Sequence, residues 1–142
     1  MANTVQLNKK YTLPHAVIWE FLITLTGTYP NQSGAIGTPG ETVNFNGASN
    51  PNKLARPKIP AGPPAARLPQ TSDIKVLNAP AGYDAVVEQN AANPTPANFA
   101  MRVFAAGSGN AAPQELGTGA NYPATFANEP WVVHVYAPLK YN

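Results

Sequence analysis

The residues best able to carry catalytic or metal chemistry in this chain are its two histidines, His15 and His134, and there is no cysteine. A zinc site needs three or four ligands, which are mostly His and Cys, so the sequence predicts no zinc centre. The absence of thiols also excludes disulfides and cysteine nucleophiles. His134 stands between Val133 and Val135, where we expect a hydrogen-bonded or solvent-facing histidine within a strand. We therefore expect neither a metal nor another cofactor.

The seven carboxylates and four serines do not form a recognisable catalytic set. No serine lies in the Gly-x-Ser-x-Gly turn that presents the nucleophile of many hydrolases. Asp84 and Glu88 would share one face of a strand about 13 Å apart, from the ~3.3 Å rise per residue, whereas the carboxylates of a retaining glycosidase lie about 5–5.5 Å apart. Glu20, inside an apolar run, is expected to form an ion pair with a lysine or an arginine. We predict that the protein is not an enzyme.

The composition is low in charge. Charged residues make up 11% of the 142-residue chain, and the formal net charge is +2, whereas about a quarter of the residues are charged in ordinary domains. A nucleic-acid-binding domain normally carries a dense basic face, so no nucleic-acid partner is expected. The length fits one domain with its own core, and the low charge suits a surface that neighbouring subunits cover.

Short apolar runs separated by loops rich in Pro, Gly and Asn are typical of β proteins. The expected strands are residues 42–46, 73–77, 83–89, 99–105 and 131–137. Residues 14–26 are ambiguous, because their β-branched and aromatic side chains favour a strand, whereas Pro14 at the start and Gly27 past the end favour a helix. The sequence predicts a mainly β fold: a small single-domain β-sandwich or barrel, jelly-roll-like, with long loops and, in the helical alternative, one N-terminal helix.

A proline-rich, basic segment interrupts this pattern. No acidic residue lies between Glu41 and Asp73, and residues 51–69 contain six prolines. Because proline removes a backbone donor and fixes φ, this segment can form neither a helix nor a central strand. Within a single domain of residues 1–142, we expect an extended, polyproline-like arm at 48–70 and a second arm at 1–11. The side chains expected to bind a partner are Lys9, Lys10, Arg56, Lys58, Ile59, Arg67 and Leu68.

In composition and layout over its whole length, the chain resembles the capsid decoration (cement) proteins of tailed bacteriophages. The features that carry the resemblance are the β-rich domain, the long Pro/Gly/Asn loops, the lack of cysteine and the extended arm. The resemblance implies a structural virion protein that binds the capsid surface and stabilises the shell, with the viral capsid protein and copies of itself, commonly a trimer, as partners. A small coat, tail or head-completion protein is an alternative of the same kind.

No membrane contact is expected. The most apolar run, residues 16–25, spans ten residues and contains Glu20, whereas a membrane-spanning helix needs about 20 apolar residues. The first ten residues lack the basic start and apolar stretch of a signal peptide. We therefore expect synthesis in the host cytoplasm and a final location in the virion.

A carbohydrate-binding β-sandwich module is the alternative of a different class. Such modules need exposed aromatic rings that can form a platform beside amide side chains. The candidate rings are Tyr29, Tyr83, Tyr122, Trp131 and Tyr141.

Overall fold

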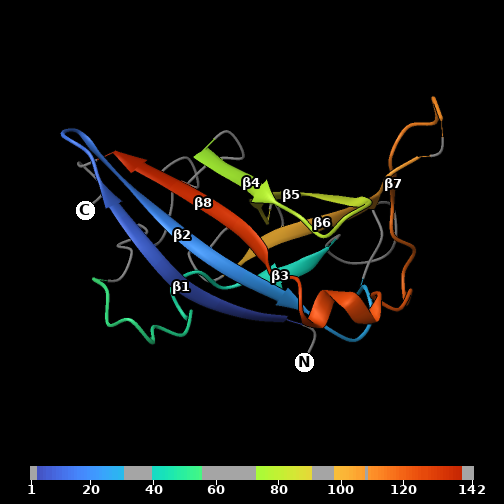
Figure 1. The fold of residues 1–142 in the computed structure, drawn as a ribbon, viewed down its shortest axis with the longest axis horizontal. Helices are drawn as coiled ribbons and strands as arrows, with labels where there is room; N and C mark the ends of the chain where they lie inside the picture. Colours follow the sequence, from blue (N-terminus) through green and yellow to red (C-terminus); the bar gives the residue numbers. More distant parts are fainter. Residues whose placement is uncertain (1–2, 31–39, 56–72, 91–97, 108, 139–142) are drawn as a thin grey trace.

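Two antiparallel sheets make up the fold in a computed structural model that describes residues 3–30, 40–55, 73–90, 98–107 and 109–138. The first sheet has the strand order β1-β2-β8-β4, and the second has the order β3-β6-β5, with β7 also paired to β6. Figure 1 shows the two sheets packed against each other. The strands are β1 (Asn3–Thr12), β2 (Ala16–Leu25), β3 (Glu41–Val43), β4 (Ile74–Asn78), β5 (Tyr83–Gln89), β6 (Phe99–Ala105), β7 (Gln114–Glu115) and β8 (Trp131–Pro138).

The chain wraps between the sheets as it does in a jelly roll. From β2 onward it passes to the second sheet at β3, returns to the first at β4, and crosses again at β5. The last strand, β8, then inserts between β2 and β4. The protein is therefore a mainly β sandwich of jelly-roll character, as the sequence predicted.

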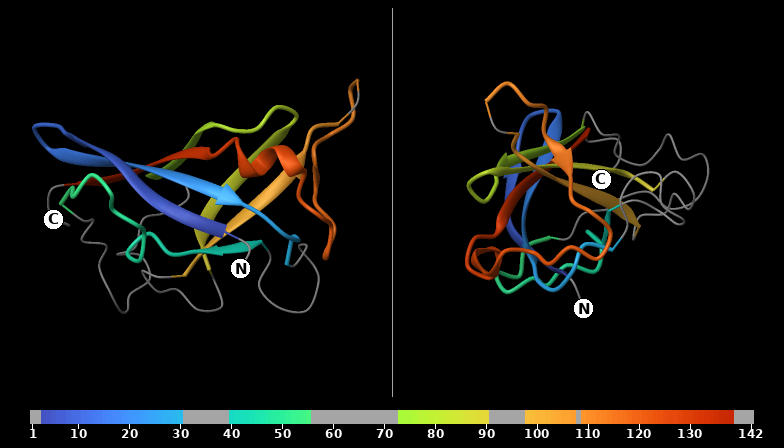
Figure 2. Two further views of the ribbon diagram at one scale, coloured as in Figure 1. Left: turned by 60° about the horizontal axis from the view of Figure 1, so that its bottom comes forward. Right: turned by 90° about the vertical axis from the view of Figure 1, so that its right-hand side faces the viewer.

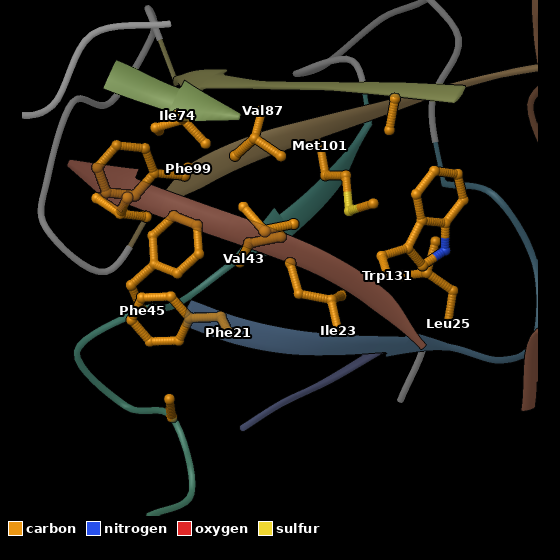
Figure 3. Packing of buried hydrophobic residues seen from close by; sticks show 14 of the residues in the cluster. Phe21, Ile23, Leu25, Val43, Phe45, Ile74, Val87, Phe99, Met101 and Trp131 are labelled. Atoms are coloured by element: carbon orange, nitrogen blue, oxygen red, sulfur yellow. The ribbon is translucent and has the colours of Figure 1, made fainter. Parts of the chain in front are cut away.

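The core lies between the inner faces of the sheets. Alternate residues of β2 are buried from Val17 to Leu25, and alternate residues of β8 are buried from Trp131 to Ala137. Figure 3 shows how these side chains meet those of the second sheet, such as Val87 and Met101. Three phenylalanine rings form its aromatic centre, with centroids 4.7 Å apart for Phe21 and Phe45 and 5.2 Å apart for Phe45 and Phe99.

The ambiguous segment 14–26 forms strand β2 and not a helix. Both of its faces are needed in the sheet, because the inward residues fill the core and the outward residues line the opposite surface. Pro14 precedes the strand, in the turn between β1 and β2, so it removes no hydrogen bond from the ladder.

The expectation of an N-terminal arm at residues 1–11 is wrong for the residues that the structure describes. Asn3–Thr12 is strand β1, which pairs antiparallel with β2 from Asn3 opposite Leu25 to Thr12 opposite Val17. Leu7 is fully buried, and Val5 packs against the core. This strand was missed because its other residues are mostly Asn, Gln, Lys and Thr, which face away from the core or lie near its rim.

The expected arm at 48–70 begins within the domain. Ser49 lies beside β1, where its carbonyl accepts a hydrogen bond from the Leu7 N–H at 2.8 Å and its N–H donates to the Val5 carbonyl at 2.9 Å. Figure 2 shows this teal segment running along β1. Residues 48–55 thus cover one edge of the first sheet instead of extending away. The rest of the predicted arm, with Arg56, Lys58, Ile59, Arg67 and Leu68, lies outside the described residues.

Between β6 and β8 the chain forms the short strand β7 and then a 3-10 helix, η3 (Ala124–Ala127). Within the part of the chain that the structure describes, no helix has the length and apolarity needed to cross a membrane.

Candidate functional site on the outer face of the first sheet

A row of four charged or polar side chains crosses the outer face of the first sheet. The strand registers place Lys9 opposite Glu20, Glu20 opposite His134, and His134 opposite Lys75. Because neighbouring strands lie about 4.8 Å apart, the two lysines at the ends of the row stand roughly 14 Å from each other. We call Lys9, Glu20, His134 and Lys75 the charged row.

Apolar side chains flank the charged row on both sides. One neighbouring row places Tyr11 opposite Ile18 and Ile18 opposite Tyr136. The other pairs Leu22 with Val132 at its centre, has Gln6 and Asn78 at its two ends, and lies beside Leu77. Leu77 is 58% exposed at an irregularity in the β4–β8 register between Val76 and Asn78, a type of feature that re-aims side chains at sheet edges. We call this surface, formed by the charged row and the two apolar rows, the outer face.

Glu20 and His134 form a hydrogen-bonded pair at the centre of the outer face. His134 Nε2 lies 3.0 Å from Glu20 Oε1, and Asn8 Nδ2 donates to Glu20 Oε2 at 2.7 Å. Burial raises the pKa of the Glu20 carboxyl, but the hydrogen bonds from His134 and Asn8, together with the charge of Lys9, outweigh it, so the net pKa lies below its ordinary value. Glu20 is therefore held ionised. The ring of Tyr11 lies 5.7 Å from that of His134.

The expectation of a lysine or arginine ion pair for Glu20 is corrected by this geometry. The direct partner is His134, which lies on the adjacent strand, and Lys9 contributes only an electrostatic attraction. The interpretation of His134 as a hydrogen-bonded strand histidine is confirmed. Glu20 and His134 are 114 positions apart in the chain, so only the pairing of β2 with β8 brings them together.

A shallow hollow opens beside the histidine. It has a volume of about 300 Å³ and lies over β2, β8 and β4. Its lining combines apolar side chains with two charges and an imidazole, and consists of Ile18, Asp73, Lys75, Leu77, His134 and Tyr136. The size is at the lower end for small-ligand pockets and is sufficient for one apolar side chain of a partner. Among the described residues, no group of three or more His, Cys, Asp or Glu side chains could hold a metal ion.

The structure does not form the predicted carbohydrate platform. Tyr29 and Trp131 are fully buried and Tyr122 is 7% exposed, so three of the five candidate rings belong to the core. Tyr83 is half-buried, with its ring 4.9 Å from that of Phe126. Tyr141 lies outside the described residues.

Two buried carboxylates explain why two of these tyrosines point inward. Tyr122 Oη donates to Glu41 Oε1 at 2.6 Å, and Tyr29 Oη donates to Glu115 Oε2 at 2.5 Å. Arg102 completes the second network, with Nη2 3.3 Å from Glu115 Oε1. Burial comes first among the causes that raise the pKa of both phenols, followed by the hydrogen bonds to the carboxylates. These networks fasten residues 114–122 to the sandwich, and they lie away from the outer face.

Of the predicted partner-binding residues, the structure describes Lys9 and Lys10. Lys9 belongs to the charged row. Lys10 faces the other side of β1, where its Nζ lies 6.0 Å from the centre of the Trp19 ring, so only one of the two lysines can contribute to the outer face. Comparisons with protein-family models, with curated proteins and with solved structures find no match to this chain.

Several residues of the outer face were missed in the sequence, notably Lys75, Leu77 and Tyr136. A signal was present, since the outward positions of the strands 16–25 and 131–137 are nearly as apolar as the inward ones. In an ordinary antiparallel sheet with one solvated face, those positions would be polar.

Proposed function

We propose that this protein is a structural subunit of a virus particle, of the decoration (cement) type, that associates with copies of itself and with a capsid shell. The outer face is the surface through which it binds other subunits. In this role the protein performs no chemical reaction, and its contribution is the contact area that it adds between neighbouring subunits.

The observation that carries the proposal is the apolar character of the outer face. Six apolar side chains occupy outward positions there, of which Tyr11 and Leu77 are exposed and the other four are half-buried. Apolar patches on the surface mark interaction sites on soluble proteins, and here two such groups flank the charged row. The patch contains Tyr11, Ile18, Leu22, Leu77, Val132 and Tyr136.

The charged row would fix the orientation of the two surfaces in such an interface. Lys9 and Lys75 stand at the two ends of the row, and the Glu20 carboxylate between them is already paired with His134. A partner surface with acidic side chains near the ends of the row and apolar side chains beside it would match this arrangement. Charges placed in this way favour one orientation and exclude others.

Fold and composition agree with the proposal without deciding it. Jelly-roll sandwiches occur in viral capsid proteins and in lectins, and a fold by itself does not fix a function. The low fraction of charged residues, 11%, suits a protein whose surface is covered in an assembly.

The proline-rich segment is the second contact surface in this proposal. Its basic and apolar side chains would lie on a neighbouring subunit, and prolines reduce the conformational entropy that is lost when an extended segment docks. Deletion of residues 56–69 should leave the sandwich folded and weaken attachment to the particle. Unchanged attachment of the deletion variant would remove the arm from the proposal.

The direct test is co-sedimentation with particles. Virus particles purified from the cells that express this chain should retain the protein through a gradient, in a fixed ratio to the major coat protein. The Leu77→Asp variant should remain in the soluble fraction, whereas Val86→Asp should still sediment, because Val86 is an exposed side chain of the other sheet, 37% exposed. A wild-type protein that never sediments with particles would refute the virion assignment.

A further inference from the structure

Asn46 is followed by Gly47, and no other asparagine of the chain precedes a glycine. The pair lies in an exposed turn after β3, in the teal segment of Figure 2. The Ala48 N–H donates to the Phe45 carbonyl across this turn at 3.4 Å, which is longer than the ordinary N–H···O distance of about 2.9–3.0 Å. The backbone of the turn by itself therefore closes it only weakly.

An Asn-Gly pair in an exposed turn can react without an enzyme. The Gly47 nitrogen gives its proton to solvent and attacks the side-chain carbonyl carbon of Asn46. A new C–N bond forms, and the side-chain nitrogen takes up a proton and leaves as ammonia. Water then opens the resulting succinimide at either carbonyl, which gives aspartate or isoaspartate. Glycine favours the ring closure because it has no Cβ to hinder the approach of the two groups.

The side chain of Asn44 restrains the attacking nitrogen. The Gly47 N–H donates to Asn44 Oδ1 at 2.8 Å, a contact between an Asn side chain and a nearby backbone group that is typical of turns. A Cβ at position 47 would lie 2.5 Å from Asn44 Nδ2, so a larger residue there would displace the Asn44 side chain. The hydrogen bond must break before the nitrogen can lose its proton. Gly47 thus makes Asn46 reactive and is also the residue that Asn44 restrains.

We infer that Asn46 is a site of spontaneous deamidation and that the hydrogen bond from Gly47 to Asn44 sets the rate. The inference does not rest on the proposed function, because the reaction needs only this turn and water. Removal of the Asn44 acceptor should raise the rate about fivefold, the factor that corresponds to the net contribution of one neutral hydrogen bond.

The reaction would change the charge and the anchoring of the segment that follows. The new carboxylate would be the only one between Glu41 and Asp73. Isoaspartate also lengthens the backbone between Phe45 and Ala48, both of which are buried. The turn leads directly into residues 48–55, which cover the edge of β1. Deamidation would therefore loosen this cover as the protein ages.

The test compares deamidation rates in the wild type and in two variants of Asn44. Each purified protein would be incubated at mildly alkaline pH, and the mass gain that replaces an amide by an acid would be assigned to individual residues by tandem mass spectrometry of proteolytic peptides. We expect faster modification of Asn46 in Asn44→Ala. The matched control is Asn44→Asp, which keeps an oxygen acceptor for the Gly47 N–H and should modify no faster than the wild type. Circular dichroism confirms that each variant is folded.

The wild type in urea supplies a second comparison that needs no variant. Loss of the turn should accelerate the reaction at Asn46, as Asn44→Ala does. Faster modification in Asn44→Ala and in urea, but not in Asn44→Asp, supports the inference. Equal rates at Asn46 in the folded and the unfolded wild type would overturn the restraint by Asn44. Modification that falls mainly on other asparagines would overturn the assignment of the site.

Discussion

His134 Nε2 lies 3.0 Å from Glu20 Oε1 in the middle of a sheet face whose neighbouring rows are apolar. A fully apolar face would be prone to non-specific association, whereas this pair places the charged Glu20 carboxylate, with His134 as its partner, within the face. It also joins β2 to β8, the two central strands of the first sheet. The pair therefore contributes to stability, and in the proposed interface it would also help to orient a partner.

The Glu20→Gln variant should be less stable than the wild type near neutral pH. The substitution removes the charge that His134 and Asn8 stabilise, and hydrogen bonds to charged groups contribute about 1.5–3 kcal/mol. We expect a loss of about 1–2 kcal/mol in the free energy of unfolding, measured by urea denaturation. The exposed control Glu129→Gln should change it by less than about 0.5 kcal/mol.

The same pair predicts a pH dependence. The pKa of Glu20 is lowered on folding. The ionised carboxylate therefore stabilises the fold above the unfolded-state pKa of about 4.5, and this stabilisation is lost as the pH falls through the lower pKa of the folded state. The difference in the free energy of unfolding between the wild type and Glu20→Gln should therefore become smaller at acid pH. A difference that stays constant on acidification would show that the carboxylate charge is not the stabilising feature.

The Leu77→Asp variant should dissociate the oligomer without unfolding the domain. Leu77 is 58% exposed, so the substitution costs the isolated subunit little, whereas in the interface it would bury an unpaired carboxylate. We expect a monomeric mass by light scattering and an unchanged circular dichroism spectrum. Val86→Asp should keep the mass of the wild type, and equal dissociation by both variants would mean that the outer face is not the specific interface.

The Tyr122→Phe variant should be destabilised without any effect on assembly. Its hydroxyl donates to the buried Glu41 carboxylate at 2.6 Å, and the loss of a donor to a buried acceptor costs about 1–3 kcal/mol. Thermal unfolding should show the loss, and light scattering at a temperature where the variant is folded should show the mass of the wild type. Tyr11→Phe, at an exposed site, is the control for stability.

Alkaline titration should reveal the two buried phenols. The pKa values of Tyr29 and Tyr122 are raised above the ordinary 10.0, first by burial and then by hydrogen bonds to Glu115 and Glu41. Groups with raised folded pKa values favour the folded state below the unfolded pKa, and this advantage is lost as pH rises. Phenolate absorbance should therefore show two of the six tyrosines ionising together with alkaline unfolding. Their ionisation in the intact fold near pH 10 would contradict the two networks.

The sequence predicted the fold better than the site. Strands β5, β6 and β8 were found within one residue of their ends, because alternating or continuous apolar runs bounded by turn residues are a local signal. Strand β1 was missed because only Val5 and Leu7 mark its inner face, and its partner on the outer edge, Ser49, lies far along the chain.

The outer face could not be derived from the sequence, since it depends on strand register. The order β1-β2-β8-β4 brings residues near positions 9, 20, 75 and 134 into one row, and nothing local in the chain specifies that order. The apolar outward positions of β2 and β8 were visible, but they could be assigned to a shared face only once the two strands were known to pair.

The measurement that tests the central claim most directly is the mass of the purified protein by light scattering after size exclusion, over a range of concentrations. We predict a discrete oligomer with a mass three times the 15.0 kDa of one chain, and a mass of one chain for Leu77→Asp. A wild-type protein that stays at 15.0 kDa at every concentration would contradict the claim that copies of this chain assemble through the outer face.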